Sequence, residues 1–162
     1  MISSIKNKFT LNAVLIFSVF ALITAYFIQY ILGHEPCNLC LIERIPYLAT
    51  IILTSLIFIL NKYEKIISLI VGLFFIFGAV VSFYHFGIEQ GFFNESLVCD
   101  LSNSNKATSA QDLLKQLEKK TVSCKDVTFK LFGLSLATFN TIISLILSAI
   151  MFKIAINYDK NK

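Results

Sequence analysis

The sequence is poor in charge, proline, glycine and arginine, and it has no tryptophan. Only 15% of its 162 residues are charged, whereas 56% are hydrophobic. A soluble domain carries about 25% charged and about 45–50% apolar residues, so the composition argues against a soluble globule. Two prolines and six glycines exclude collagen-like and low-complexity chains. The 16 phenylalanines exclude disorder, because so much apolar surface can be buried.

The hydrophobic residues gather in four blocks, each with about the 20 residues that a helix needs to cross a bilayer. The blocks cover residues 12–32, 41–60, 66–88 and 131–152. Four strands could not close a membrane barrel, so the blocks must be helices. Short connectors make neighbouring helices antiparallel. We therefore predict an all-α membrane protein, an antiparallel four-transmembrane-helix bundle that forms one domain over residues 1–162.

The first block is predicted to be a retained span rather than a cleaved signal. It follows Lys6 and Lys8, as a signal core would. It is nevertheless longer than the about 7–15 residues of a signal core, and no A-x-A cleavage site follows it.

Lysines distinguish one side of the predicted bundle from the other. Four spans place both termini and the middle connector on one side, where seven lysines fall in short segments: Lys6, Lys8, Lys62, Lys65, Lys153, Lys160 and Lys162. Of the two loops on the other side, 33–40 has no lysine, and 89–130 balances six lysines with six acidic residues. The positive-inside rule then makes the termini cytoplasmic and the loops extracytoplasmic. No basic face for nucleic acid is indicated.

Two local patterns refine this fold. Small and polar residues recur at helical spacing in the last two blocks, which predicts close helix packing: Ser68, Gly72, Gly78, Ser82, Thr141, Ser144 and Ser148. In the long loop, residues 109–112 fit a capping box, and Leu113, Leu114 and Leu117 follow. We predict a short amphipathic helix on the membrane surface there, with an ordinary solvated helix as the alternative.

All four cysteines lie in or beside the two outer loops, at Cys37, Cys40, Cys99 and Cys124. Disulfides persist on the extracytoplasmic side, and four cysteines permit three pairings. The pair Cys99 and Cys124 could staple the loop, share a zinc ion with the other two cysteines, or form a second redox pair. We favour the redox pair and predict no metal ligands. Leu41 after Cys40 excludes the haem-attachment signature C-x-x-C-H.

The C-x-x-C motif of Cys37 and Cys40 is typical of a reactive thiol pair. Cys40 begins the second block, and a helix N-terminus favours a thiolate. Arg44, the single arginine, lies one helical turn later and would favour a nearby anion. A membrane-surface anchor is the alternative interpretation of Arg44, with Glu43 a chance neighbour. His85 and Glu89 are also one turn apart, so they form either a plain pair or a polar group facing a bound redox partner.

Together these motifs resemble the disulfide bond formation protein B (DsbB) family over essentially the whole chain. The resemblance rests on the run from Cys37 to Arg44, on Cys99-Asp100 and Cys124, and on residues 132–137, Phe-Gly-Leu-Ser-Leu-Ala. Three features depart from the family pattern. The chain has no tryptophan, Phe139 stands where a tryptophan is common, and Glu43 stands where many relatives have glutamine.

The resemblance implies a bacterial inner-membrane enzyme that re-oxidises a soluble periplasmic dithiol protein of the thioredoxin fold, DsbA. The electrons would pass to a membrane quinone, ubiquinone or menaquinone. Cys99 would form the mixed disulfide with the partner, and Cys124 would be its mate. Cys37 and Cys40 would receive the electrons, with Cys40 facing the quinone. Arg44, His85 and Glu89 are then the predicted quinone-binding residues.

Two other functions fit parts of the pattern. A reductase of the vitamin K epoxide reductase type also uses four helices and two cysteine pairs, but its C-x-x-C follows the loop pair in the chain, whereas here it precedes it. A non-enzymatic transporter or scaffold with a stapled loop should carry ionisable residues at mid-depth in its spans. The ionisable residues Glu43, Arg44, His85 and Glu89 all lie near the outer edge instead.

Overall fold

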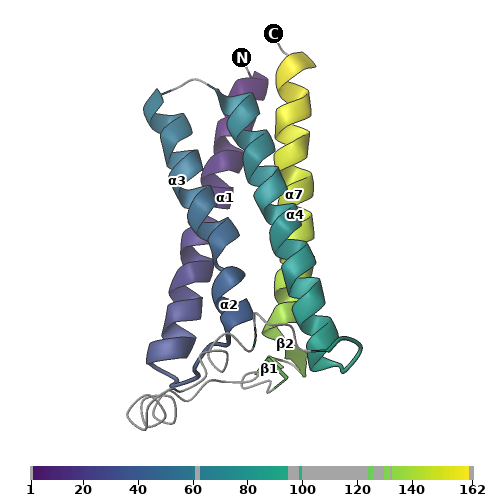
Figure 1. The fold of residues 1–162 in the computed structure, drawn as a ribbon. Coiled ribbons are helices and arrows are strands. Elements are labelled where there is room, and N and C mark those ends of the chain that lie inside the picture. The colour runs from purple at the N-terminus through teal and green to yellow at the C-terminus, as the bar shows by residue number, and fades with distance from the viewer. Residues whose placement is uncertain are drawn as a thin grey trace, which may run out of the picture.

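Four long helices form the bundle in the part of the chain that the structure describes, and the predicted all-α bundle is confirmed (Figure 1). The computed structural model describes residues 2–60, 63–94, 99, 124–125, 130–131 and 133–160. Its long helices are α1 (Ile2–Tyr30), α3 (Ile45–Leu60), α4 (Glu64–Glu89) and α7 (Leu136–Lys160), and the short helix α2 (Asn38–Ile42) precedes α3. Both termini lie at one end of the bundle, and α2 lies toward the other end (Figure 1).

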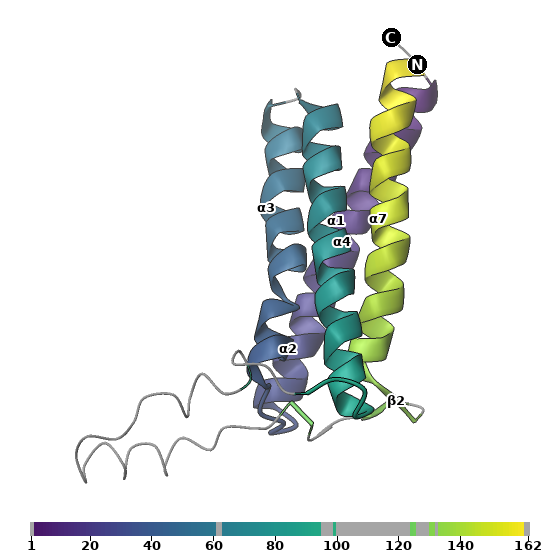
Figure 2. The same cartoon turned by 45° about the vertical axis from the view of Figure 1, so that its right-hand side comes forward.

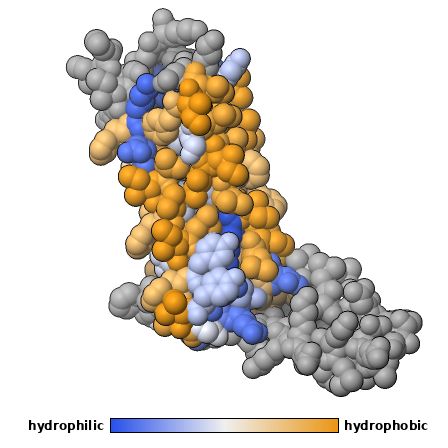
Figure 3. Space-filling view, turned by 90° about the vertical axis from the view of Figure 1, so that its left-hand side faces the viewer, coloured by the Kyte–Doolittle hydropathy of each residue, from blue (hydrophilic) through white to orange (hydrophobic). Residues whose placement is uncertain are grey.

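Within the described residues, four helical stretches are long and apolar enough to cross a membrane. They cover Lys8–Tyr30, Asn38–Leu60, Glu64–Glu89 and Leu136–Asn157. Each overlaps one predicted block. Large apolar side chains such as Ile16, Ile52 and Val80 face outward, and apolar residues cover most of the face shown in Figure 3. Such a surface suits lipid rather than water.

The second span is broken, which the sequence prediction of one helix over 41–60 did not include. α2 ends at Ile42, residues 43–44 form a turn, and α3 begins at Ile45. Pro46 explains the break, because it has no N–H to donate to the carbonyl of Ile42 and its ring would clash with that carbonyl. The turn brings Glu43 inside the bundle, where its exposed fraction is 8%.

The fourth span begins later than predicted. Leu131, Leu134 and Ser135 are not helical, because β1 (Lys130–Leu131) pairs antiparallel with β2 (Leu134–Ser135). Gly133 between the strands has φ +82°, a conformation that glycine adopts without the strain of a side chain. α7 therefore starts at Leu136 and continues past residue 152 to Lys160.

Helix α4 is central to the packing: it lies between α3 and α7, and its pairing with α7 is the most extensive (Figure 2). The small residues predicted to bring helices together are buried at Ser68, Gly72, Gly78 and Ser82 on α4 and at Ser144 and Ser148 on α7. An apolar core joins all four long helices through residues such as Leu11, Ile57, Phe75 and Met151. The predicted amphipathic helix after residue 109 lies outside the described residues.

Candidate thiol redox site

The C-x-x-C motif forms the N-terminus of α2. Cys37 is the N-cap residue, and its Sγ accepts a hydrogen bond from the backbone N–H of Cys40 at 3.4 Å. The two sulfurs lie 2.9 Å apart, and both cysteines are free thiols. The sequence predicted that the helix N-terminus would act on Cys40. The structure instead directs this N–H group at Cys37, because the residue before the first turn is the one that caps it.

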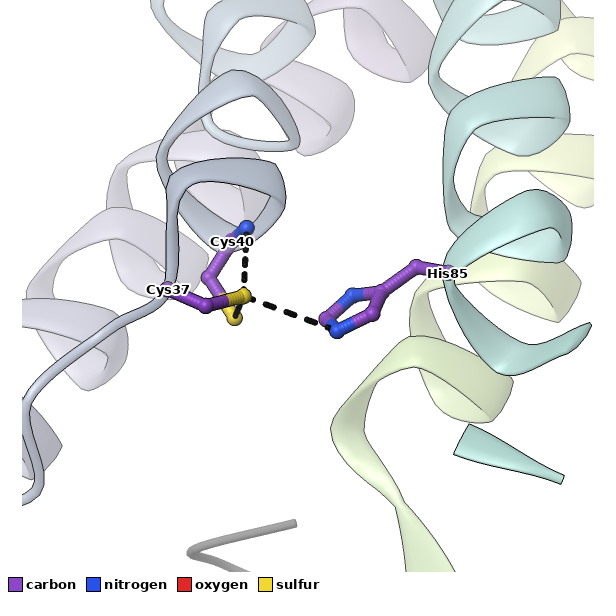
Figure 4. Close-up of side chains that lie close together, drawn as sticks. All are labelled: Cys37, Cys40 and His85. Carbon is purple, nitrogen blue, oxygen red and sulfur yellow. Dashed lines mark hydrogen bonds between the residues drawn. The ribbon is translucent and has the colours of Figure 1, made fainter. Parts of the chain in front are cut away.

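His85 of α4 faces the thiol pair from across the bundle (Figure 4). Its Nε2 lies 3.6 Å from Cys37 Sγ, and its Nδ1 lies 2.7 Å from Glu43 Oε1. All three side chains are buried. The arrangement resembles that of an activated nucleophile, in which a base touches the nucleophile and a third group orients the base.

Glu43 is held by a second helix as well. Asn140 of α7 donates from Nδ2 to Glu43 Oε2 at 2.9 Å and to Ser82 Oγ at 2.6 Å. The Oδ1 atom of Asn140 accepts from the Tyr47 hydroxyl at 2.5 Å. Both carboxylate oxygens of Glu43 therefore have donors facing them, which a buried carboxylate requires.

Sequence reasoning missed Glu43 and Asn140 as members of the site. The single available signal for Glu43 was a carboxylate inside an apolar run, since buried charges need partners. Asn140 carried a similar signal as an amide in a predicted span. Neither signal indicates which residue would be the partner, because Glu43 and Asn140 are 97 positions apart.

Glu89 completes the polar surroundings of His85. Its Oε1 lies 3.7 Å from His85 Nε2, so the predicted pairing one turn apart is confirmed. The other oxygen, Oε2, is buried and has no hydrogen-bond partner among the described residues. The Oε2 atom of Glu89 can therefore still accept a hydrogen bond.

Arg44 binds α1 rather than a sulfur. Its Nη1 donates to Gln29 Oε1 at 2.7 Å, and its guanidinium carbon lies 5.0 Å from the centroid of the Tyr26 ring. These two contacts fix the direction of the cation, because the planar guanidinium is both hydrogen-bonded and stacked.

The environment of Cys37 favours its thiolate. A hydrogen bond from the Cys40 thiol is the largest influence, and the hydrogen bond and charge of His85 act in the same direction. Burial opposes them, yet together they lower the pKa of the Cys37 thiol to about 4. Cys37 is therefore the better nucleophile of the pair at neutral pH.

Cys99 and Cys124 form a disulfide, which selects one of the three possible pairings. This disulfide is buried, with 2% of Cys124 exposed, and it packs in one cluster with Cys37, Leu39 and Ile88. Cys40 packs against the same cluster. The two cysteine pairs are therefore neighbours in space, although 59 positions separate Cys40 from Cys99.

A cavity of about 440 Å³ opens beside the thiol pair. Its lining includes five of the seven predicted site residues: Cys37, Cys40, Arg44, His85 and Glu89. Apolar residues of α1 and α7 form much of the remaining wall, including Phe20, Ala21, Ile28, Phe139 and Ile143. A largely apolar wall with a few convergent polar groups is typical of a pocket for a small organic ligand.

Comparisons with known proteins match one family over most of the chain. A family model described as "Disulfide bond formation protein DsbB" matches residues 7–154. A relative from Rickettsia prowazekii (strain Madrid E), named "Uncharacterized protein RP370", is 35% identical over 149 residues, which cover 88% of this chain and 85% of the relative. No solved structure matches the chain significantly.

Proposed function

The chain belongs to the DsbB family of membrane oxidoreductases for disulfide bond formation, and on this basis we propose that it re-oxidises a DsbA-like dithiol protein and passes the electrons to a quinone. One observation carries the proposal. The Cys99–Cys124 disulfide and Cys37 pack in one buried cluster, while Cys40 lines the adjacent cavity. Thiol–disulfide exchange between the loop pair and the C-x-x-C pair would therefore carry electrons over a short distance to the cavity.

The thiol chemistry follows from this placement. A thiolate of the partner attacks the Cys99–Cys124 disulfide at Cys99, which gives a mixed disulfide and releases Cys124 as a thiol. The second thiol of the partner then displaces Cys99, so the partner leaves oxidised and the loop pair is reduced by two electrons. Exchange with a Cys37–Cys40 disulfide restores the loop disulfide and leaves Cys37 and Cys40 as the dithiol.

The pair next to the cavity must then lose two electrons and two protons. His85 is placed to take part in proton movement, because its Nε2 faces Cys37 and its Nδ1 faces Glu43. The charge of Glu43 stabilises the cationic form of this imidazole. The low pKa of the Cys37 thiol keeps that sulfur ready for attack at neutral pH.

The residues around the cavity fit a quinone. A quinone needs a flat apolar slot and donors for its carbonyl oxygens, and when bound it accepts the two electrons and two protons. Arg44 offers a donor on the polar side, where His85 also borders the cavity, and Phe20, Ala21 and Ile143 form apolar wall. Glu89 borders the same space. We propose that these residues hold the ring beside Cys40.

The proposed location is the bacterial inner membrane, with both termini in the cytoplasm and the cysteines in the periplasm. The four apolar helices support a multi-pass membrane protein. Both termini lie at the end of the bundle opposite α2 and Cys37 (Figure 1), and the lysine-rich short segments favour the cytoplasm for the end with the termini.

The proposal is tested with detergent-purified protein, a reduced periplasmic dithiol protein and a soluble ubiquinone analogue. Quinone absorbance and thiol loss are followed together. We expect catalytic, equimolar loss of quinone and of the partner's dithiol. Substitution of any one of the four cysteines by alanine should abolish this turnover. A substitution on the outward-facing surface, such as Ile52→Ala, should leave it unchanged. Full turnover by any single cysteine variant would refute the two-pair route.

A further inference from the structure

The geometry points to a binding site for a thiophilic divalent cation such as Zn²⁺, formed by Cys37 Sγ, Cys40 Sγ and His85 Nε2 in the reduced protein. The ligand atoms of these three residues all lie within 4.8 Å of one another. Figure 4 shows the two sulfurs and the imidazole converging on one space. Two sulfurs and one imidazole match the donor set of open Cys₂His zinc sites.

The distance from sulfur to nitrogen fits such an ion, whereas the distance between the two sulfurs must increase. A tetrahedral zinc ion, with bonds of about 2.3 Å to sulfur and about 2.0–2.1 Å to nitrogen, separates the sulfur and the nitrogen by about 3.6 Å. Cys37 Sγ and His85 Nε2 lie 3.6 Å apart. Two sulfurs on the same ion lie about 3.7 Å apart, so the 2.9 Å between Cys37 and Cys40 must widen. A side-chain rotation of the partly exposed Cys40 supplies this change.

The surroundings of His85 provide a second, independent indication. A metal-binding imidazole nearly always donates its other ring N–H to a carboxylate, a backbone carbonyl or water, which fixes the tautomer. His85 Nδ1 is 2.7 Å from Glu43 Oε1, so Nε2 is left for the ion. Asn140 holds the other oxygen of Glu43 and thereby fixes the carboxylate itself.

Glu89 lies outside this group of three ligand atoms but beside the imidazole. Its Oε1 lies 3.7 Å from His85 Nε2. Its Oε2 is buried and has no hydrogen-bond partner among the described residues. The negative charge of this carboxylate would favour a cation bound at His85.

Binding requires the reduced pair, because a metal ion takes thiolates and displaces the thiol protons. The site therefore exists only when Cys37 and Cys40 are not joined to each other. An ion bound to both sulfurs would hold them reduced and block further exchange. This inference concerns the cysteine pair and His85 alone and does not depend on which molecule oxidises them.

The test uses Co²⁺ as a coloured substitute for Zn²⁺, with full-length protein in detergent under anaerobic conditions. A Cys99→Ser/Cys124→Ser background removes the loop thiols. We expect thiolate-to-cobalt charge-transfer and tetrahedral ligand-field bands that saturate at one ion per chain. The same protein with Cys37 and Cys40 oxidised to a disulfide is the matched control and should show no bands.

Variants in that background locate the ligands. Cys37→Ser and Cys40→Ser should each remove the charge-transfer intensity of one sulfur, and His85→Gln should weaken cobalt binding. Glu43→Gln should weaken it by about 10–100-fold, as expected for the carboxylate behind a ligating imidazole. His34→Gln, a histidine before the motif, should bind cobalt normally. Helix content from circular dichroism verifies that each variant is folded.

Two results would overturn the inference. One is a reduced, folded protein with two titratable thiols that shows no cobalt bands. The other is cobalt binding of full strength in the folded His85→Gln variant, because the histidine would then not be a ligand.

Discussion

Glu43→Gln is the substitution that most directly tests how the site activates Cys37. The change keeps the shape of the side chain and removes its charge. His85 then loses the carboxylate that stabilises its cationic form through the 2.7 Å contact at Nδ1. Because the hydrogen bond and charge of His85 help to lower the pKa of Cys37, that pKa should rise when Glu43 is neutral.

The size of the rise can be worked out from the interaction that is lost. A hydrogen bond to a charged group contributes about 1.5–3 kcal/mol, and each pKa unit corresponds to about 1.4 kcal/mol. The pKa of Cys37 should therefore rise from about 4 to about 5–6. At pH 5 the thiolate fraction would fall from about 90% to between about 50% and about 10%.

The assay measures the rate at which iodoacetamide alkylates Cys37 as a function of pH, by mass spectrometry of reduced protein that lacks the loop cysteines. A thiol with a lowered pKa stays reactive until the pH falls through that pKa, so the midpoint of the curve reports it. The Glu43→Gln midpoint should lie about 1–2 pH units higher.

Glu89→Gln is the matched control for this assay. It removes a carboxylate that lies 3.7 Å from Nε2 of His85 and does not contact Nδ1, so it should raise the midpoint less than Glu43→Gln does. Equal midpoints in Glu43→Gln and in the unchanged chain would refute the proposed link from Glu43 through His85 to Cys37. A rise of the same size in Glu89→Gln would refute it too, because any nearby charge would then suffice.

Three further predictions concern packing and the cavity. Asn140→Leu leaves an oxygen of Glu43 without its donor, which should cost about 1–3 kcal/mol and lower the thermal midpoint in detergent; an unchanged midpoint would contradict the network. Gly78→Ala should destabilise more than Gly72→Ala in the same melt, because its added carbon would come 2.9 Å from a proline ring, whereas the one at position 72 meets a phenylalanine ring at 3.3 Å. Arg44→Lys should raise the KM for the quinone analogue, because an ammonium lacks the planar fork that is stacked and hydrogen-bonded here; an unchanged KM would remove this residue from the proposed cavity.

The span positions were predictable because lipid imposes a simple length and hydropathy requirement. The exact helix ends were not, since local geometry decides them. Leu131 and Leu134 are apolar enough for a span, yet they pair with each other in two short strands. Pro46 was a visible signal for a break in the second span, but a proline can also be accommodated within a membrane helix.

The candidate site was predictable in its sulfur chemistry and not in its polar network. The C-x-x-C spacing and the placement of all four cysteines in or beside the predicted outer loops indicate thiol exchange from the sequence alone. The network joins Glu43, His85 and Asn140 from the turn before α3 and from two other helices. Such contacts depend on how each helix is rotated about its own axis relative to its neighbours. That rotation cannot be predicted from a single sequence.

The break before Pro46 buries the carboxylate of Glu43 and, through His85, also affects the reactivity of the thiol pair. In a continuous helix, the 3.6-residue period would fix the direction of the side chain at position 43. The turn at residues 43–44 instead directs Glu43 toward α4 and α7. Burial of its charge is unfavourable unless partners compensate, and His85 and Asn140 provide them. The same compensation fixes Nε2 of His85 toward Cys37. Stability and thiol activation therefore depend on the same contacts, so a substitution that restores a normal Cys37 pKa should also loosen the packing of α4 against α7.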